Sequence, residues 1–199
     1  MMISATLFVF VAGVLCIAVV LAVLAVTHLY YMTTSRAVMD DGMARGAAAP
    51  IWELADSAGV VVRSPPESRP FQLIVFADHS LKSFPSVTQG LLDLLRTTSE
   101  LEIVMLMRHP SDLAEGIFRV LGLGEIPVLA GSSALYGRYN VRVMPFAIFV
   151  DTEGRVRASS LVNNEWQVEQ LWRLANVALG PAEVQAAGHR GRRLARAGV

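Results

Sequence analysis

The feature of this sequence that most restricts its fold is a long apolar run at the N-terminus. Residues 3–26 carry no charged side chain, and Ser4 and Thr6 are the only hydroxyl-bearing residues in the run. In an α-helix, about 20 apolar residues are enough to cross the hydrocarbon core of a bilayer. Tyr30 and Tyr31 follow the run, and such aromatic side chains favour the membrane interface. The sequence therefore predicts one N-terminal transmembrane helix over residues 3–31.

A cleaved signal peptide is the alternative explanation of this run. Such a peptide carries basic residues before an apolar core of roughly 7–15 residues. No Lys or Arg precedes residue 26, and the run is longer than that core, so a retained anchor is favoured. Arg36 and Arg45 follow the span, and positive charge marks the cytoplasmic side of a membrane. We therefore expect a single-pass protein of the cell membrane with its C-terminal domain in the cytoplasm, and the extracytoplasmic alternative stays open.

The rest of the chain divides by composition into a linker, a domain and a tail. Residues 32–50 are short of large apolar side chains and contain Gly42, Gly46 and Pro50, which is typical of a linker. Residues 51–180 hold the alternating apolar elements of a folded domain. Residues 181–199 are rich in arginine. Their charge suits either contact with anionic membrane lipid or a solvated, disordered tail.

Apolar strands alternate with amphipathic helices across the domain. The runs FQLIVF and LEIVMLM are almost entirely apolar, as expected of strands buried on both faces of a sheet. The turn at residues 151–154 joins the last two strands into a hairpin. The expected elements are strands 71–76, 101–107, 146–150 and 155–161, a short extended piece 127–129, and helices 86–97, 111–121, 132–139 and 164–179. This order predicts an α/β fold with a central sheet flanked by helices.

Two segments carry a resemblance to a known family. Residues 139–156 contain an X-Pro pair, Met144-Pro145, followed by an apolar strand and an Asp-x-x-Gly turn. Residues 71–84 form a buried strand that leads through a loop into a helix. Together these segments resemble the membrane-anchored thioredoxin-like proteins of the TlpA and MauD type, over residues 50–180. The resemblance implies a thioredoxin-like central sheet flanked by helices and a cis peptide bond between Met144 and Pro145.

The redox motif of that family is missing from this sequence. In the relatives a Cys-x-x-Cys motif follows the first buried strand. Counting from Phe76 places Leu81 and Phe84 at the two cysteine positions, with Lys82 and Ser83 between them. Thiol–disulfide exchange needs a thiolate, and the only cysteine of the chain lies in the N-terminal apolar run. Thiol-disulfide oxidoreductase activity is therefore disfavoured, and we expect no enzyme activity.

The loop around Met144, Pro145 and Phe146 is a second candidate site. In active relatives this loop offers backbone groups to an extended substrate, so without cysteines it could still hold a peptide. The alternative is that Pro145 only shapes the fold. Residues 78–82 include Asp, His and Ser, but neighbours on one loop rarely form a catalytic triad.

Several classes of ligand have no support in the sequence. No two histidines share the spacing of metal ligands, and the single cysteine excludes a cysteine-rich zinc site. The formal net charge is zero, which gives no indication of a nucleic-acid partner. We therefore expect no cofactor, no metal and no nucleic acid.

These observations favour a non-catalytic accessory or scaffolding subunit of a larger membrane complex. The expected partner is a polytopic membrane protein or a multisubunit membrane complex, and a transporter such as a lipid-import system is one host that fits. Trp166 and Trp172 are six residues apart on the last helix, so we expect one in the core and the other available as an interface anchor. The alternative function is a non-redox peptide holdase or maturation factor of the MauD type, acting through the Pro145 loop.

Overall fold

The computed structural model describes residues 13, 15–26, 41–56, 58–109, 116, 118 and 120–180. It divides into two compact units, residues 1–40 and residues 41–199. In the first unit, residues 13 and 15–26 are helical with exposed side chains. Within the described ranges, no helix is both long and apolar enough to span a bilayer. The predicted span, 3–31, lies partly outside the described residues, and the predicted tail, 181–199, lies wholly outside them.

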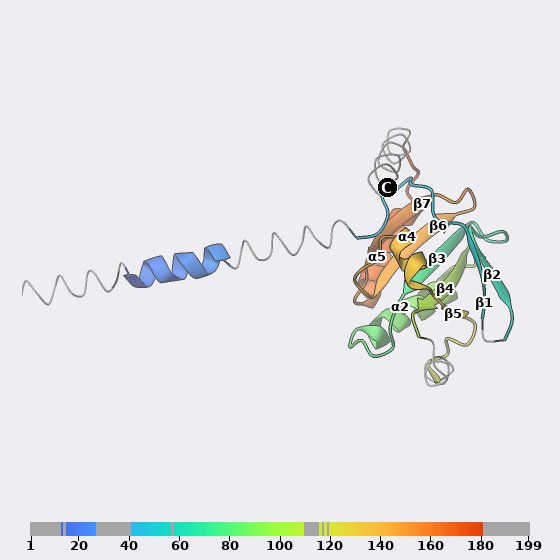
Figure 1. Ribbon diagram of the computed structural model, residues 1–199, viewed down its shortest axis with the longest axis horizontal. Helices are drawn as coiled ribbons and strands as arrows, with labels where there is room; N and C mark the ends of the chain where they lie inside the picture. The colour runs from blue at the N-terminus through green and yellow to red at the C-terminus, as the bar shows by residue number, and fades with distance from the viewer. Residues whose placement is uncertain are drawn as a thin grey trace, which may run out of the picture. The chain divides into compact units, whose positions relative to one another are not determined.

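A five-stranded mixed sheet forms the centre of the second unit, in the order β5-β4-β3-β6-β7 (Figure 1). β3 pairs parallel with β4 and antiparallel with β6, and β4 pairs parallel with β5. β6 and β7 form the predicted hairpin, and Gly154 in its turn has a φ of 71°. The predicted strands 71–76 and 101–107 are confirmed to the residue. The strands are β3 (Phe71–Phe76), β4 (Leu101–Met107), β5 (Val128–Ala130), β6 (Phe146–Asp151) and β7 (Val156–Leu161).

Helices α2 (Phe84–Thr97) and α5 (Glu165–Ala175) cover one face of this sheet. The Asn164 side chain caps α5 by accepting a hydrogen bond from the Gln167 amide at 2.9 Å. Gly90 allows the two helices to approach closely, because a Cβ at that position would lie 2.8 Å from the Cα of Glu165. We call the core between these helices and the sheet the helix-side core. Its fully buried members include Leu73, Val75, Leu91, Met105, Leu123 and Phe149.

The opposite face of the sheet is covered by α4 (Ser133–Arg138) and by a hairpin of β1 (Trp52–Ala55) and β2 (Val61–Ser64). We call the core on this face the hairpin-side core. The ring of Phe76 makes edge-to-face contacts with Tyr136 and Tyr139, at centroid distances of 5.0 and 5.3 Å. The Trp52 indole donates a hydrogen bond to the Tyr139 hydroxyl at 2.9 Å, which ties the hairpin to the aromatic cluster.

The compact domain begins at Asp41, whereas the sequence predicts a linker as far as residue 50. The Gly46 amide donates to the Val156 carbonyl at 2.7 Å. The Asp41 carboxylate, whose side chain is 2% exposed, accepts a hydrogen bond from the Arg142 guanidinium at 2.6 Å. Residues 41–50 therefore belong to the domain, in contrast to the prediction. Their small side chains let the backbone itself pack on β7, and hydropathy does not register that contact.

Two predicted helices have different ends in the structure, and a third lies mostly outside the described residues. Helix α5 ends at Ala175, before the predicted end at 179, and the Val177 carbonyl instead accepts hydrogen bonds from the guanidinium groups of Arg45 and Arg157. Helix α2 begins two residues earlier than predicted, with Pro85 in its first turn, where proline is well tolerated. The helix predicted over 111–121 lies mostly outside the described residues, although residues 116, 118 and 120 are helical.

Candidate functional site

The two candidate loops lie at the same end of the sheet. Phe76, the last residue of β3, is the ladder partner of Phe146, the first residue of β6. The loop that follows β3 therefore leaves the sheet next to the loop that precedes β6. The Met144–Pro145 peptide bond is cis, as the resemblance implies. The Pro145 carbonyl accepts a hydrogen bond from the Val162 amide at 3.0 Å, which holds this loop to the end of β7.

The four residues at the degenerate redox positions lead into helix α2. Phe84 is its first residue and is 3% exposed, and its ring makes an edge-to-face contact with Phe118 at 5.6 Å. Leu81 is half-buried and packs against the same helix-side core. Lys82 is exposed, and Ser83 precedes the helix without a side-chain hydrogen bond to it. The side chains of Leu81 and Phe84, the two predicted cysteine positions, therefore contribute to packing.

The side chains of the two loops enter different cores. Leu81 and Phe84 pack in the helix-side core, whereas Met144 and Phe146 pack in the hairpin-side core. Phe146 is 1% exposed. Its ring lies against Gly42, where a Cβ would come within 2.4 Å of the ring. Of the three residues predicted for the Pro145 loop, only Met144 keeps partial exposure. The structure thus places the loops side by side without bringing their side chains together.

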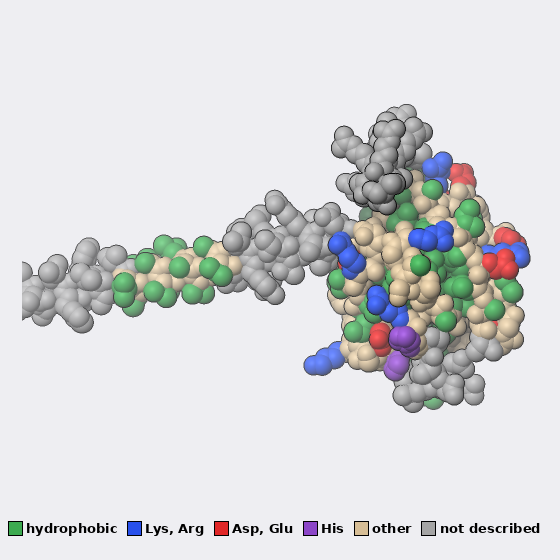
Figure 2. All heavy atoms as spheres, viewed as in Figure 1, with side chains coloured by type: hydrophobic (Ala, Val, Ile, Leu, Met, Phe, Trp, Pro, Cys, Tyr) green, Lys and Arg blue, Asp and Glu red, His purple; other side chains and the backbone are tan. Residues whose placement is uncertain are grey.

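A polar turn, residues 78–80, lies between β3 and the redox positions. The Asp78 carboxylate accepts hydrogen bonds from the Ser80 amide at 2.9 Å and from the Ser80 hydroxyl at 2.8 Å. These hydrogen bonds, and to a smaller extent the nearby His79 and His109, lower the pKa of Asp78. Figure 2 shows the described histidine side chains on one face of the domain, close to an acidic side chain.

The turn lacks the geometry of a hydrolytic or metal site. The Ser80 hydroxyl donates to Asp78, so it is not paired with His79 as a nucleophile with its base. The His79 imidazole lies 3.8 Å from the Asp78 carboxylate, beyond hydrogen-bond distance. Across the part of the chain that the structure describes, no group of three or more His, Cys, Asp or Glu residues could hold a metal ion.

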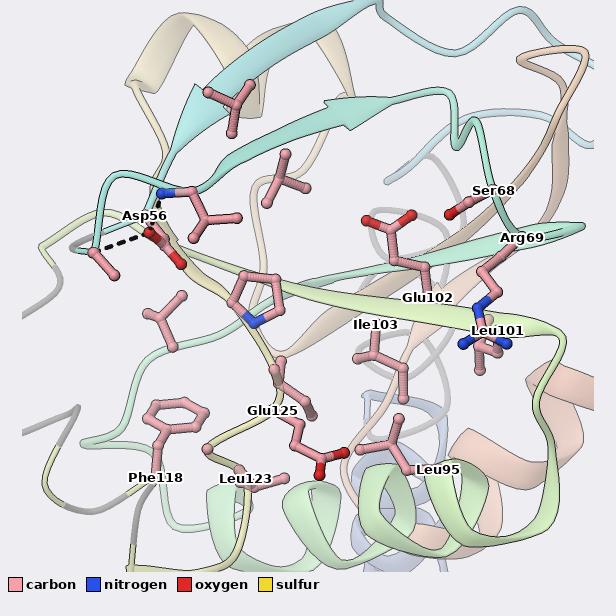
Figure 3. Close-up of a pocket in the computed structure, with 18 residues that line it drawn as sticks. Asp56, Ser68, Arg69, Leu95, Leu101, Glu102, Ile103, Phe118, Leu123 and Glu125 are labelled. Carbon is pink, nitrogen blue, oxygen red and sulfur yellow. Dashed lines mark hydrogen bonds between the residues drawn. The ribbon is translucent and has the colours of Figure 1, made fainter.

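A cavity of about 670 Å³ lies at the opposite end of the sheet, beside the first residues of β4 (Figure 3). Sequence reasoning did not single out this place. Its charged lining residues include Arg69, Glu102 and Glu125. Burial raises the pKa of Glu102, and the Gln72 amide and the Arg69 guanidinium partly oppose that rise. The one sequence signal for the cavity was a carboxylate inside the otherwise apolar run LEIVMLM.

The two tryptophans of α5 lie in different environments, as predicted from their spacing. Trp172 is half-buried, and its ring contacts Phe71 and Phe149 at centroid distances of 5.6 and 5.5 Å. Trp166 is 64% exposed and borders a second cavity, of about 520 Å³, that is also lined by residues of α2. Trp166 is therefore a largely exposed side chain on the surface of α5, and Trp172 packs in the helix-side core.

Comparison with solved structures shows a thioredoxin-like fold. The thioredoxin domain of a thiol-disulfide oxidoreductase from Bacteroides vulgatus matches with a TM-score of 0.57 and 16% identity, over 67% of this chain and 99% of that one. A peroxidoxin from Mycobacterium tuberculosis matches with a TM-score of 0.57 and 15% identity, over 69% and 99% of the two chains. A putative thioredoxin from Neisseria meningitidis matches with a TM-score of 0.53 and 15% identity, over 65% and 91%. At these identities the likeness concerns the fold alone. No known family profile and no curated protein matches the sequence.

Proposed function

We propose that this chain is a non-catalytic thioredoxin-like accessory subunit, held at the cell membrane by its N-terminal apolar run. The observation that carries the proposal is the burial of Phe84. At the place where the resemblance implies the second cysteine, this chain has an aromatic ring that is 3% exposed and packed against Phe118. The sequence of the domain contains no cysteine, because the only one is Cys16. A fold that keeps its core without its thiols is suited to binding rather than to redox chemistry.

The proposed partner is a polytopic membrane protein or a multisubunit membrane complex. The apolar run at residues 3–26 supports a membrane location, and Arg36 and Arg45 favour a cytoplasmic domain. Trp166 supports a docking role, since it is 64% exposed on α5 and tryptophan is enriched among the residues that dominate interface energies. Contact of the basic tail with membrane lipid, and a transporter as the host complex, are parts of the same proposal.

The Pro145 loop gives less support to the alternative role as a peptide holdase. Pro145 and Phe146 are both buried, and Met144 is half-buried. A client segment would therefore find little exposed apolar side chain at this loop. This observation favours the accessory subunit over the holdase.

Mild-detergent extraction of the tagged full-length chain tests the proposal. We expect one membrane partner to co-elute at a fixed stoichiometry, and the purified chain to reduce insulin no faster than buffer. A monomeric chain with no partner would contradict the docking role. Insulin reduction above the buffer rate would contradict the non-catalytic role. Transient binding of diverse unfolded clients, abolished by a bulky substitution at Met144, would favour the holdase instead.

A further inference from the structure

Strand β4 has an outer edge that β5 covers only in part. β5 pairs with the last three residues of β4, and among the residues that the structure describes no strand lies beside residues 101–104 on that side. The Met105 amide donates to the Pro127 carbonyl at 3.0 Å, so Met105 directs its backbone groups toward the outer edge. Alternate residues of a strand turn their backbone groups the same way. Leu101 and Ile103 therefore present their N–H and C=O groups at the uncovered part of this edge.

The backbone groups of Leu101 and Ile103 have no hydrogen-bond partner among the described residues. The other side of β4 is occupied, since the Phe71 amide donates to the Glu100 carbonyl at 3.2 Å and the ladder with β3 continues from there. Pro127 has no N–H, so the chain that enters β5 cannot extend the ladder to the Ile103 carbonyl. An edge with two free N–H and two free C=O groups is a template for one more strand.

The cavity of about 670 Å³ lies along this free edge. Leu101 and Ile103 line it from β4, and Val61 and Val62 line it from β2. Figure 3 shows Leu101 and Ile103 beside the cavity, with Leu95 of α2 and Leu123 on the side away from the hairpin. Apolar walls on both sides would accept the alternating side chains of an extended segment, which point to opposite faces.

The charges around the cavity determine which side chain the segment should carry. Among the lining residues that the structure describes, Asp56, Glu102 and Glu125 contribute carboxylates, and Arg69 contributes the one guanidinium. Figure 3 shows the three carboxylates bordering the cavity from different sides. The Arg69 guanidinium already donates to the Ser99 carbonyl. The described part of the lining therefore has an excess of negative charge, which would attract an arginine or lysine.

We propose that the free edge of β4 binds an extended segment of a partner protein as an additional strand, with a basic side chain of that segment directed toward Glu125. The backbone groups of Leu101 and Ile103 provide the main-chain hydrogen bonds, and the Glu125 carboxylate selects the basic residue. This inference rests on the proposed function, since it names the surface and the chemistry through which an accessory subunit would hold its partner.

The test uses the full-length chain and three pools of nine-residue amidated peptides, with degenerate Val and Thr positions around a central arginine, glutamate or alanine. We expect the arginine pool to bind roughly tenfold more tightly than the glutamate pool, because the central side chain changes from attracting the Glu125 carboxylate to repelling it. Amide hydrogen exchange gives the second readout. Leu101 and Ile103 are only 5% and 3% exposed, but their amides have no acceptor among the described residues, so they should gain protection when the arginine pool binds. The Glu102 and Val104 amides face β3 and should be protected in both states.

Glu125→Lys and Glu153→Lys form a matched pair for the same assay. Both side chains are exposed, but Glu125 lines the cavity and Glu153 does not. Glu125→Lys should weaken the arginine pool roughly tenfold and Glu153→Lys should leave it unchanged. Equal binding of the three pools, or binding that leaves the Leu101 and Ile103 amides unprotected, would overturn the inference. Mild-detergent extraction separates this inference from the proposed function. If the Glu125→Lys chain still co-elutes with a stoichiometric membrane partner, the edge inference fails and the accessory function stands. If the unmodified chain has no partner, the proposed function fails.

Discussion

Phe84→Ala is expected to lower the free energy of unfolding by about 3–5 kcal/mol. Burial of an aromatic side chain of this size is worth about 2–3 kcal/mol. The edge-to-face contact with Phe118 adds roughly 0.5–1.5 kcal/mol, and the cavity left behind adds the rest. The large value is expected because Phe84 is 3% exposed and is the first residue of α2, with its side chain in the helix-side core.

Urea unfolding of the full-length chain, followed by tryptophan fluorescence, measures this loss. Trp172 reports on the same core through its contacts with Phe71 and Phe149. Lys82→Ala is the matched control, since Lys82 is exposed two residues earlier and its loss should change stability by less than about 0.5 kcal/mol. A loss below about 1 kcal/mol for Phe84→Ala, with an unchanged urea dependence, would refute the assignment of Phe84 to the core.

Three further predictions follow from the same packing and electrostatics. Gly90→Ala should destabilise the chain by about 1–3 kcal/mol because the new Cβ meets the Glu165 backbone, whereas Gly137→Ala, in open space on α4, should be neutral or stabilising by up to about 1 kcal/mol in the same urea assay. Burial raises the pKa of Glu102 above its ordinary value of 4.5, so the native state holds an extra proton and the free energy of unfolding falls as pH rises through the interval above 4.5. Glu102→Gln should therefore be more stable than the parent chain at neutral pH, and the advantage should disappear below pH 4.5 in a pH series of unfolding curves. Burial raises the pKa of Tyr136 to about 12, so Tyr136→Phe should remove one tyrosine's share of the absorbance change near pH 12 in the tyrosinate titration of the folded chain.

The central strands could be predicted from the sequence because their apolar runs are uninterrupted on both faces. FQLIVF became β3, and five of its six residues are buried. LEIVMLM became β4, and Glu102 is the only member that is not buried. A strand inside a two-layer core has the same environment on both faces, so local composition alone specifies it. The hairpin between β6 and β7 was predictable for a similar reason, since Gly154 supplies the positive φ that the turn needs.

The start of the domain could not be predicted from hydropathy. Residues 41–50 attach to the domain through backbone hydrogen bonds, such as Gly46 to Val156, and through the ion pair of Asp41 with Arg142. Partners more than 100 residues away in sequence leave no local pattern in a glycine- and alanine-rich segment. Gly42 is a particular case, because its lack of a side chain allows the Phe146 ring to pack against it.

The positions of the candidate loops in the sequence were predictable, but the surroundings of their side chains could be known only from the structure. Counting from Phe76 located Leu81 and Phe84, yet only the structure shows that they enter a different core from Met144 and Phe146. The free edge of β4 was beyond sequence reasoning, since it depends on how far β5 extends along its neighbour. Pro127 is visible in the sequence, but the sequence does not show that its missing N–H leaves the Ile103 carbonyl without a donor from β5.

The most direct test of the central claim is the amount of membrane partner that co-purifies with a chain carrying Cys16→Ser. This substitution removes the only thiol of the protein. If the domain acts by docking, the variant should retain one partner at the same fixed stoichiometry as the parent chain after mild-detergent extraction. Loss of the partner on removal of the thiol, or a monomeric parent chain, would contradict the account.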